Sequence, residues 1–163
     1  GFIADPSILQ DLNTPAIDYA KLIMKSVAVK GAVVSNDFRE SFAREILNYG
    51  HTVGHAIEMH SDYKLRHGEA VSIGMIFAAE LSSELAGLNK DVVDLHRELL
   101  RNFSLPINYA EKKWPRLLTH LTQDKKVKGS RLRFIGIRKI GKPIWFEDVS
   151  TSQLAKVYER IAK

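Results

Sequence analysis

The sequence predicts a mainly α, single domain with one small β-hairpin. Over most of the 163 residues, apolar side chains recur at three- and four-residue intervals, the spacing of one helix face. Around Gly141-Lys142-Pro143 the pattern changes to alternation, which is typical of two strands joined by a turn. No internal repeat or linker divides the chain, and its length suffices to bury one substantial core. We therefore expect residues 1–163 to form one folding unit.

Helical periodicity dominates the first part of the chain. Apolar positions suit a helix face from Ile8 to Val29, and the pattern is interrupted at 31–36. Asp37 followed by Glu40 is a capping-box signature, which predicts a helix from Phe38 to about Met59.

A second helix is expected to start at His67 and to be buried. The segment from His67 to Leu81 is apolar on nearly every side, as in a helix at the centre of a domain, and Gly87 should stop it. Further helices are predicted at 91–103, 114–121 and 151–162, and the two strands should carry Leu132, Phe134, Ile144 and Phe146.

Composition narrows the classes of partner. The formal net charge of +5 favours an anionic ligand, but the basic residues are scattered, without the aromatic interleaving of a nucleic-acid groove. We therefore expect a small anionic substrate and no nucleic acid. The chain has neither a run of about 18 apolar residues nor a signal segment, which predicts a soluble, cytoplasmic protein without a membrane partner. Because it has no cysteine, any metal must be held by His, Asp or Glu.

Side chains with catalytic chemistry recur along the predicted 38–59 helix. Their spacings of 4, 4, 3 and 4 residues would place five of them on one face: Glu40, Arg44, Asn48, His51 and His55. A solvated helix face is the alternative, with Glu40 acting as a cap and Arg44 as its ion-pair partner. The two imidazoles argue for a site, since histidines at i and i+4 can point toward one ion. Gly50 and Gly54 beside them indicate that something packs closely against this helix.

A further histidine begins the buried helix, in the segment His67-Gly68-Glu69. Two helices and a turn can bring His51 and His67 together, and with one carboxylate they would form a three-ligand catalytic zinc site. The other histidines, His60, His96 and His120, are isolated and are interpreted as surface or core residues.

Together these residues resemble the signature of the 3-dehydroquinate synthases. The match rests on Arg44 to Glu58, on His67-Gly68-Glu69-Ala70-Val71 with Gly74-Met75, on Lys30-Gly31-Ala32-Val33-Val34, and on Asp124-Lys125-Lys126 with Leu132-Arg133-Phe134. It covers essentially the whole chain. The combination of Asn-x-Gly-His-x-x-Gly-His with His-Gly-Glu is specific to the sugar-phosphate cyclases.

The resemblance implies a role for each matching residue. His51 and His67 match the zinc ligands, and His55 matches a histidine that contacts substrate and helps to move protons. Residues that hold the substrate's hydroxyls, carboxylate and phosphate are matched by Lys30, Glu40, Arg44 and Asn48, and of these Lys30, Glu40 and Asn48 are also expected to be catalytic. Of Lys125 and Lys126, one should reach the phosphate, with Lys126 preferred; an exposed basic loop is the alternative.

The resemblance also implies a fold and an activity. The fold would be the helical C-terminal domain of a dehydroquinate synthase, an NAD- and metal-dependent phosphorus–oxygen lyase that uses Zn²⁺ or Co²⁺ and forms a homodimer. That enzyme converts 3-deoxy-D-arabino-heptulosonate 7-phosphate to 3-dehydroquinate and phosphate in the shikimate pathway, towards chorismate and the aromatic amino acids.

We expect the chain to be a fragment, since it begins with Gly1 and its first residues read like the middle of an element. The NAD-binding, Rossmann-like half and a glutamate that serves as third zinc ligand would lie upstream, so the chain alone should be inactive. Two alternatives remain open. One is another sugar-phosphate cyclase, such as a 2-deoxy-scyllo-inosose synthase, against which Arg44 and Lys30 argue; the other is a non-catalytic assembly module.

Overall fold

The computed structural model describes residues 1–35, 42–110, 113–128 and 132–163, with only the backbone path described at residues 42, 43 and 123–128. Within these ranges the strands are the two of a single hairpin, and most other residues are helical. The elements in chain order are α1 (Pro6–Leu12), α2 (Tyr19–Ser35), α3 (Phe42–Glu45), η1 (Ile46–Asn48), α4 (His51–His60), α5 (His67–Ala86), α6 (Lys90–Asn102), α7 (Trp114–Lys128), β1 (Arg133–Lys139), β2 (Lys142–Glu147) and α8 (Thr151–Glu159). The predicted fold class is confirmed.

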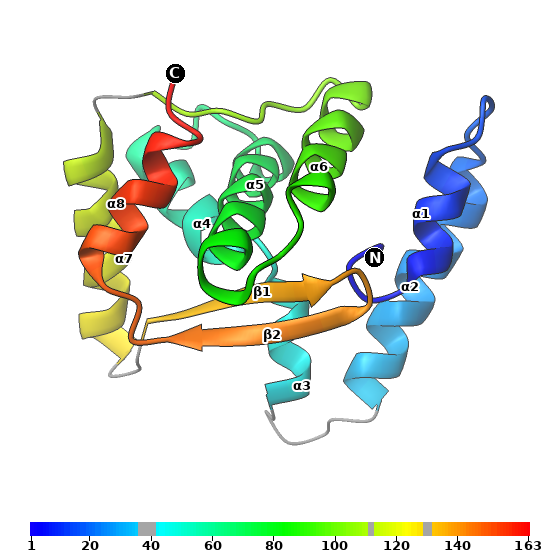
Figure 1. Ribbon diagram of the computed structural model, residues 1–163, viewed down its shortest axis with the longest axis horizontal. Helices are drawn as coiled ribbons and strands as arrows, with labels where there is room; N and C mark the ends of the chain where they lie inside the picture. The colour runs from blue at the N-terminus through cyan, green and yellow to red at the C-terminus, as the bar shows by residue number, and fades with distance from the viewer. Residues whose placement is uncertain (36–41, 111–112, 129–131) are drawn as a thin grey trace.

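Helix α5 lies at the centre of the molecule, where α4, α6, α8 and β1 pack around it (Figure 1). Its residues are buried almost without interruption from Ala70 to Ser82, because the sequence offers apolar or small side chains on every face. Burying a side chain such as Phe77, which is fully enclosed, stabilises the fold by roughly 1.5–3 kcal/mol. The helix ends at Gly87 in the left-handed conformation, as predicted.

The hairpin forms where alternation was predicted, and a hydrogen bond links it to α5. Its strands are antiparallel, with Phe134 opposite Phe146. The backbone N–H of Ile137 donates a hydrogen bond of 3.0 Å to the Ser82 hydroxyl, and Ile137 itself is fully buried. The hairpin therefore extends the core that α5 begins.

The predicted continuous helix from Phe38 to Met59 is wrong. The described part of that segment is a short α3, a turn of 3₁₀ helix and then, after Tyr49 and Gly50, the separate helix α4. Gly50 has a φ of 80°, a left-handed conformation that glycine adopts without steric cost and that no helix interior can contain. Arg44, Asn48 and the histidines therefore do not share one helix face. Asp37 and Glu40, on which the predicted cap rested, lie outside the described residues.

The interruption predicted at 31–36 is also wrong as far as Ser35. Helix α2 runs through Gly31, since one glycine costs a helix only about 1 kcal/mol. The helix predicted to end at Leu121 likewise continues to Lys128.

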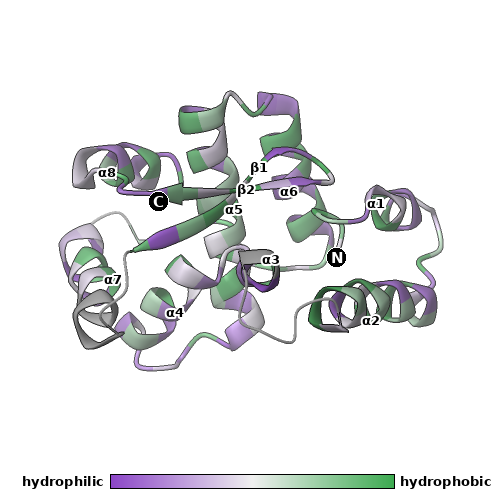
Figure 2. Ribbon diagram, turned by 90° about the horizontal axis from the view of Figure 1, so that it is seen from below, coloured by the Kyte–Doolittle hydropathy of each residue, from purple (hydrophilic) through white to green (hydrophobic). Residues whose placement is uncertain are grey.

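Helices α1 and α2 form an arm beside the main body (Figures 1 and 2). Asp11 of α1 pairs with Lys21 and Lys25 of α2 at 2.7 and 2.5 Å. Leu22 is buried, but large apolar side chains on the same helix are exposed: Tyr19, Ile23, Met24 and Val27. None of the helices in the described ranges combines the length and apolar character needed to cross a membrane.

Candidate metal and substrate site

Helices α4 and α5 cross with their backbones in contact. A Cβ atom added to Gly74 would lie 2.0 Å from the carbonyl oxygen of Gly50, and one added to Gly54 would lie 3.1 Å from the Cα of Val71. Only glycine permits so close an approach at Gly74. The prediction that something packs closely against Gly50 and Gly54 is confirmed, although Gly50 precedes the helix instead of lying inside it.

This crossing gathers three imidazoles, which we call the histidine cluster: His51, His55 and His67. His51 is the first residue of α4 and His67 the first of α5, and their ring centroids are 5.2 Å apart. The ring of His55, one turn further along α4, lies 5.6 Å from that of His51 and 5.8 Å from that of His67. The predicted convergence of His51 and His67 is confirmed.

Hydrogen bonds define which ring nitrogen is free in two of these histidines. The Nδ1 of His51 lies 3.2 Å from the carbonyl oxygen of Tyr49, and the Nδ1 of His67 lies 3.2 Å from each carboxylate oxygen of Glu58. Carbonyl and carboxylate oxygens accept hydrogen bonds, so each Nδ1 carries a hydrogen, and in the neutral form of each ring Nε2 keeps its lone pair. Metal-binding histidines are typically held in this way.

His51 also has the charge state that a metal requires. Burial lowers the pKa of His51; the hydrogen bond to the Tyr49 carbonyl opposes this decrease, and the neighbouring His55 and His67 add to it. His51 is therefore neutral at pH 7, the form that can ligate. The other two rings are exposed, His67 by 56%, so the cluster is open to a ligand.

Glu58 is the site residue that sequence reasoning missed. It follows His51 by seven residues and His55 by three, a helical spacing that could have revealed it. Its carboxylate, His55 and His67 offer ligand atoms within 4.8 Å of one another, which makes these three an alternative metal site. Glu58 also accepts the hydrogen of His67, and a carboxylate in that position can orient a metal-binding histidine. Two imidazole nitrogens suit Zn²⁺ or Co²⁺.

A pocket of about 240 Å³ adjoins the cluster, between α4 and α7. Its lining includes His55, Glu58, Tyr63, His120 and Leu121. The pocket gives a ligand bound at the cluster room to extend. His120, interpreted from the sequence as a surface or core residue, thus borders the candidate site.

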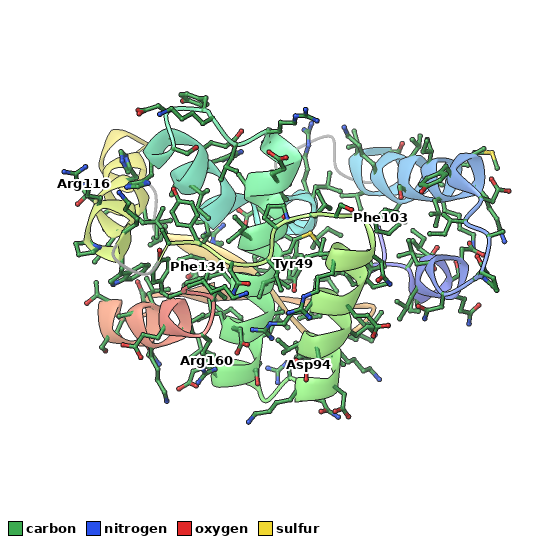
Figure 3. The ribbon with its side chains drawn as sticks, turned by 90° about the horizontal axis from the view of Figure 1, so that it is seen from above. Tyr49, Asp94, Phe103, Arg116, Phe134 and Arg160 are labelled. Atoms are coloured by element: carbon green, nitrogen blue, oxygen red, sulfur yellow. The ribbon has the colours of Figure 1, made fainter. Side chains whose placement is uncertain are left out.

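The remaining isolated histidines have structural partners. The ring of His60 shares a 2.8 Å hydrogen bond with the hydroxyl of Tyr109. His96 is fully buried, with one ring nitrogen 2.7 Å from the carbonyl of Val92 and the other 3.2 Å from the hydroxyl of Tyr49. Figure 3 shows Tyr49 near the middle of the molecule. The core interpretation is confirmed for His96, which supports the turn that precedes His51.

Strand β1 anchors the same turn from the other side. The hydroxyl of Thr52 donates a 3.1 Å hydrogen bond to the carbonyl of Arg133. The Arg133 guanidinium pairs with Glu147 at 2.8 Å and with Glu45 of α3. The start of α4 is therefore fixed by both α6 and the hairpin.

The described residues among the other predicted site residues lie on elements other than α4 and α5. Lys30 is exposed on α2, which packs against α1 and α3, while Arg44 and Asn48 are exposed on α3 and η1. In Figures 1 and 2, α3 lies between α2 and α4. Glu40 is outside the described residues, as are the side chains of Lys125 and Lys126, whose backbone follows Leu121 by about one turn of α7.

Comparisons with known proteins agree with this arrangement. The family model described as 3-dehydroquinate synthase C-terminal matches residues 1–127. A 3-dehydroquinate synthase of Paenarthrobacter aurescens (strain TC1) is 46% identical over 170 residues, which cover 99% of this chain and 47% of the relative. The chain thus spans about half the length of such relatives.

Two solved structures share the fold. A 2-epi-5-epi-valiolone synthase from Streptomyces hygroscopicus subsp. jinggangensis 5008, with NAD⁺ and Zn²⁺ bound, has a TM-score of 0.83 at 17% identity over 98% of this chain and 47% of its own. A 2-deoxy-scyllo-inosose synthase complexed with carbaglucose-6-phosphate, NAD⁺ and Co²⁺ has a TM-score of 0.71 at 26% identity over 86% of this chain and 40% of its own. With the family match over most of its length, the chain belongs to the 3-dehydroquinate synthase C-terminal family.

Proposed function

We propose that this chain is the metal- and substrate-binding half of a 3-dehydroquinate synthase. The complete protein would convert 3-deoxy-D-arabino-heptulosonate 7-phosphate to 3-dehydroquinate and phosphate, with NAD bound mainly by a second, Rossmann-like half. We propose a homodimer, by analogy with the family, and a cytoplasmic location. The observation that carries the proposal is the pair of histidines at the starts of α4 and α5, each with Nδ1 occupied and Nε2 free.

In this proposal His51 and His67 hold Zn²⁺ or Co²⁺ through Nε2. When bound, the metal supplies a positive charge that polarises a substrate hydroxyl. His55 is exposed beside both rings, so it can accept or return a proton at the same hydroxyl.

The substrate carries a carboxylate and a phosphate, which require cations. Lys30, Arg44 and one of Lys125 and Lys126 are proposed to supply them, with Asn48 and Glu40 binding hydroxyls. Since Lys30 lies on a different helix from the cluster, we infer that the substrate spans the distance between α2 and α4.

The test is an assay of 3-dehydroquinate formation from the heptulosonate phosphate with NAD and Zn²⁺. The complete protein should be active and the 163-residue chain alone inactive. Turnover by the chain alone would refute the division into two halves, and an inactive complete protein that is folded and metal-loaded would refute the activity.

A second candidate is another sugar-phosphate cyclase, favoured by the structural likeness to the inosose synthase. The 46% identity to a 3-dehydroquinate synthase outweighs the 26% identity to that enzyme. Glucose 6-phosphate, whose carba analogue is named in the inosose synthase complex, separates the two. Turnover of this substrate in place of the heptulosonate would decide for the second candidate.

A further inference from the structure

We propose that Glu58 is a positioning residue, which keeps the hydrogen of the His67 ring on Nδ1 and so leaves the lone pair of Nε2 available to a metal. The inference rests on the proposed metal site, whose ligands it concerns. It assigns a function to a carboxylate that would otherwise be counted as a ligand or as a surface charge.

The two residues in this contact differ in their exposure to solvent. Both carboxylate oxygens of Glu58 lie 3.2 Å from Nδ1 of His67. The Glu58 side chain is 14% exposed, whereas that of His67 is 56% exposed. A largely buried carboxylate on α4 therefore accepts a hydrogen bond from a solvent-exposed imidazole on α5.

His67 needs such a partner more than His51 does. The ring of His51 is half-buried, and its Nδ1 bonds to the carbonyl of Tyr49, which the backbone fixes in place. His67 begins a helix, and among the described residues its Nδ1 finds an acceptor on another element, Glu58 of α4. In water a neutral imidazole carries its hydrogen mainly on Nε2, the tautomer that would block ligation through Nε2, so the bond to Glu58 selects the other tautomer.

The competing interpretation makes Glu58 a direct ligand together with His55 and His67. In that case one carboxylate oxygen would bind the metal while the other could still accept the His67 hydrogen. The two interpretations differ in how much Zn²⁺ affinity depends on Glu58: removing a ligand abolishes it, whereas removing a positioning residue only weakens it.

The experiment uses the complete protein with ¹⁵N-labelled histidine, stripped of metal, at a pH where the rings are neutral. Glu58→Met keeps the side-chain length but removes both acceptors, and Glu58→Gln keeps one acceptor oxygen. Glu84→Met is the matched control, since Glu84 is also a partly enclosed carboxylate but pairs with Lys156 and Arg160 away from the cluster. The readouts are the His67 tautomer from ring nitrogen shifts and Zn²⁺ affinity from competition with a chelator.

We expect Glu58→Met to move the His67 hydrogen towards Nε2 and to weaken Zn²⁺ binding roughly 10- to 100-fold, with Glu58→Gln in between and Glu84→Met like the parent. An unchanged tautomer in Glu58→Met would overturn the inference, and complete loss of Zn²⁺ binding in Glu58→Met would assign Glu58 as a ligand. A parent protein that binds no Zn²⁺ would instead refute the proposed metal site, while the tautomer readout would still decide the role of Glu58.

Discussion

The α4–α5 pair and helix α2 both carry proposed site residues, but they are held in opposite ways. The pair has its backbones in contact at Gly50, Gly54 and Gly74, and the core closes around it. In α2 the buried residue is Leu22, while Ile23 and Met24 are 63% and 67% exposed. The proposed metal-binding side of the site is therefore fixed within this chain, whereas the segment with Lys30 is loosely held by it. Substitutions should have large effects in the pair and small ones in α2.

The largest effect is expected from Gly74→Ala. The added methyl group would lie 2.0 Å from the carbonyl oxygen of Gly50, so the two helices must separate. We expect the free energy of unfolding to fall by more than about 3 kcal/mol and Zn²⁺ binding to fall with it. Urea denaturation and metal titration measure the two effects. A variant with parent-like stability would show that the crossing is not rigid.

Removing a ligand should affect metal binding without disturbing the crossing. His51→Ala should weaken Zn²⁺ binding by more than about 100-fold, beyond the usual loss for a residue that only supports a ligand. His55→Ala is the control and should keep the metal while losing turnover. If His51→Ala retains stoichiometric Zn²⁺ and His55→Ala does not, the alternative set with Glu58 is the metal site.

A moderate, pH-dependent effect on stability is expected from His96, whose ring is hydrogen-bonded to the hydroxyl of Tyr49. Burial lowers the pKa of His96 to about 4, well below its ordinary value of 6.5. The unfolded chain therefore binds the proton more readily, and stability is lost as the pH falls from about 6.5 towards about 4. From this group alone, the free energy of unfolding should be about 2 kcal/mol lower at pH 5 than at pH 7.

His96→Gln should remove that part of the pH dependence, while His120→Gln, at a partly exposed site, should retain it. Urea denaturation at the two pH values measures the difference. If the free energy of unfolding changed equally between the two pH values in all three proteins, His96 would not titrate as its burial requires.

The smallest effect belongs to α2. A Cβ at Gly31 would meet no atom within 4 Å, and the residue lies inside a helix. Gly31→Ala should therefore raise the free energy of unfolding by roughly 0.5–1 kcal/mol. A melting experiment beside Gly74→Ala tests the contrast directly. Destabilisation by Gly31→Ala would mean that α2 is as tightly packed as the pair.

The spacing of apolar residues predicted the fold well where an element packs into the core. The buried α5, its end at Gly87 and the hairpin were all expected from the sequence. The failure at Gly50 has a physical cause: the spacing of Asn48, His51 and His55 also fits a continuous helix. Only the contact with Gly74, a residue of another element, explains why the backbone turns there.

The site was predictable in part for a related reason. His51 and His67 could be paired because each stands at a recognisable position in its helix. The bond between His67 and Glu58 depends on how α4 and α5 cross, which one sequence does not reveal. No common helix face joins Arg44, Asn48 and the histidines, because the continuous helix that would have carried them does not form.

The backbone contact between α4 and α5 also determines which part of the chain sets the distance between the two proposed metal ligands. The connector at 61–66 is a surface turn, with Asp62 and Tyr63 in the left-handed region. Because the first residues of both helices are fixed by the crossing, the connector only has to reach from one helix to the other. The length of the connector can thus vary without moving the two proposed ligands, while the close approach that glycine permits at the crossing cannot.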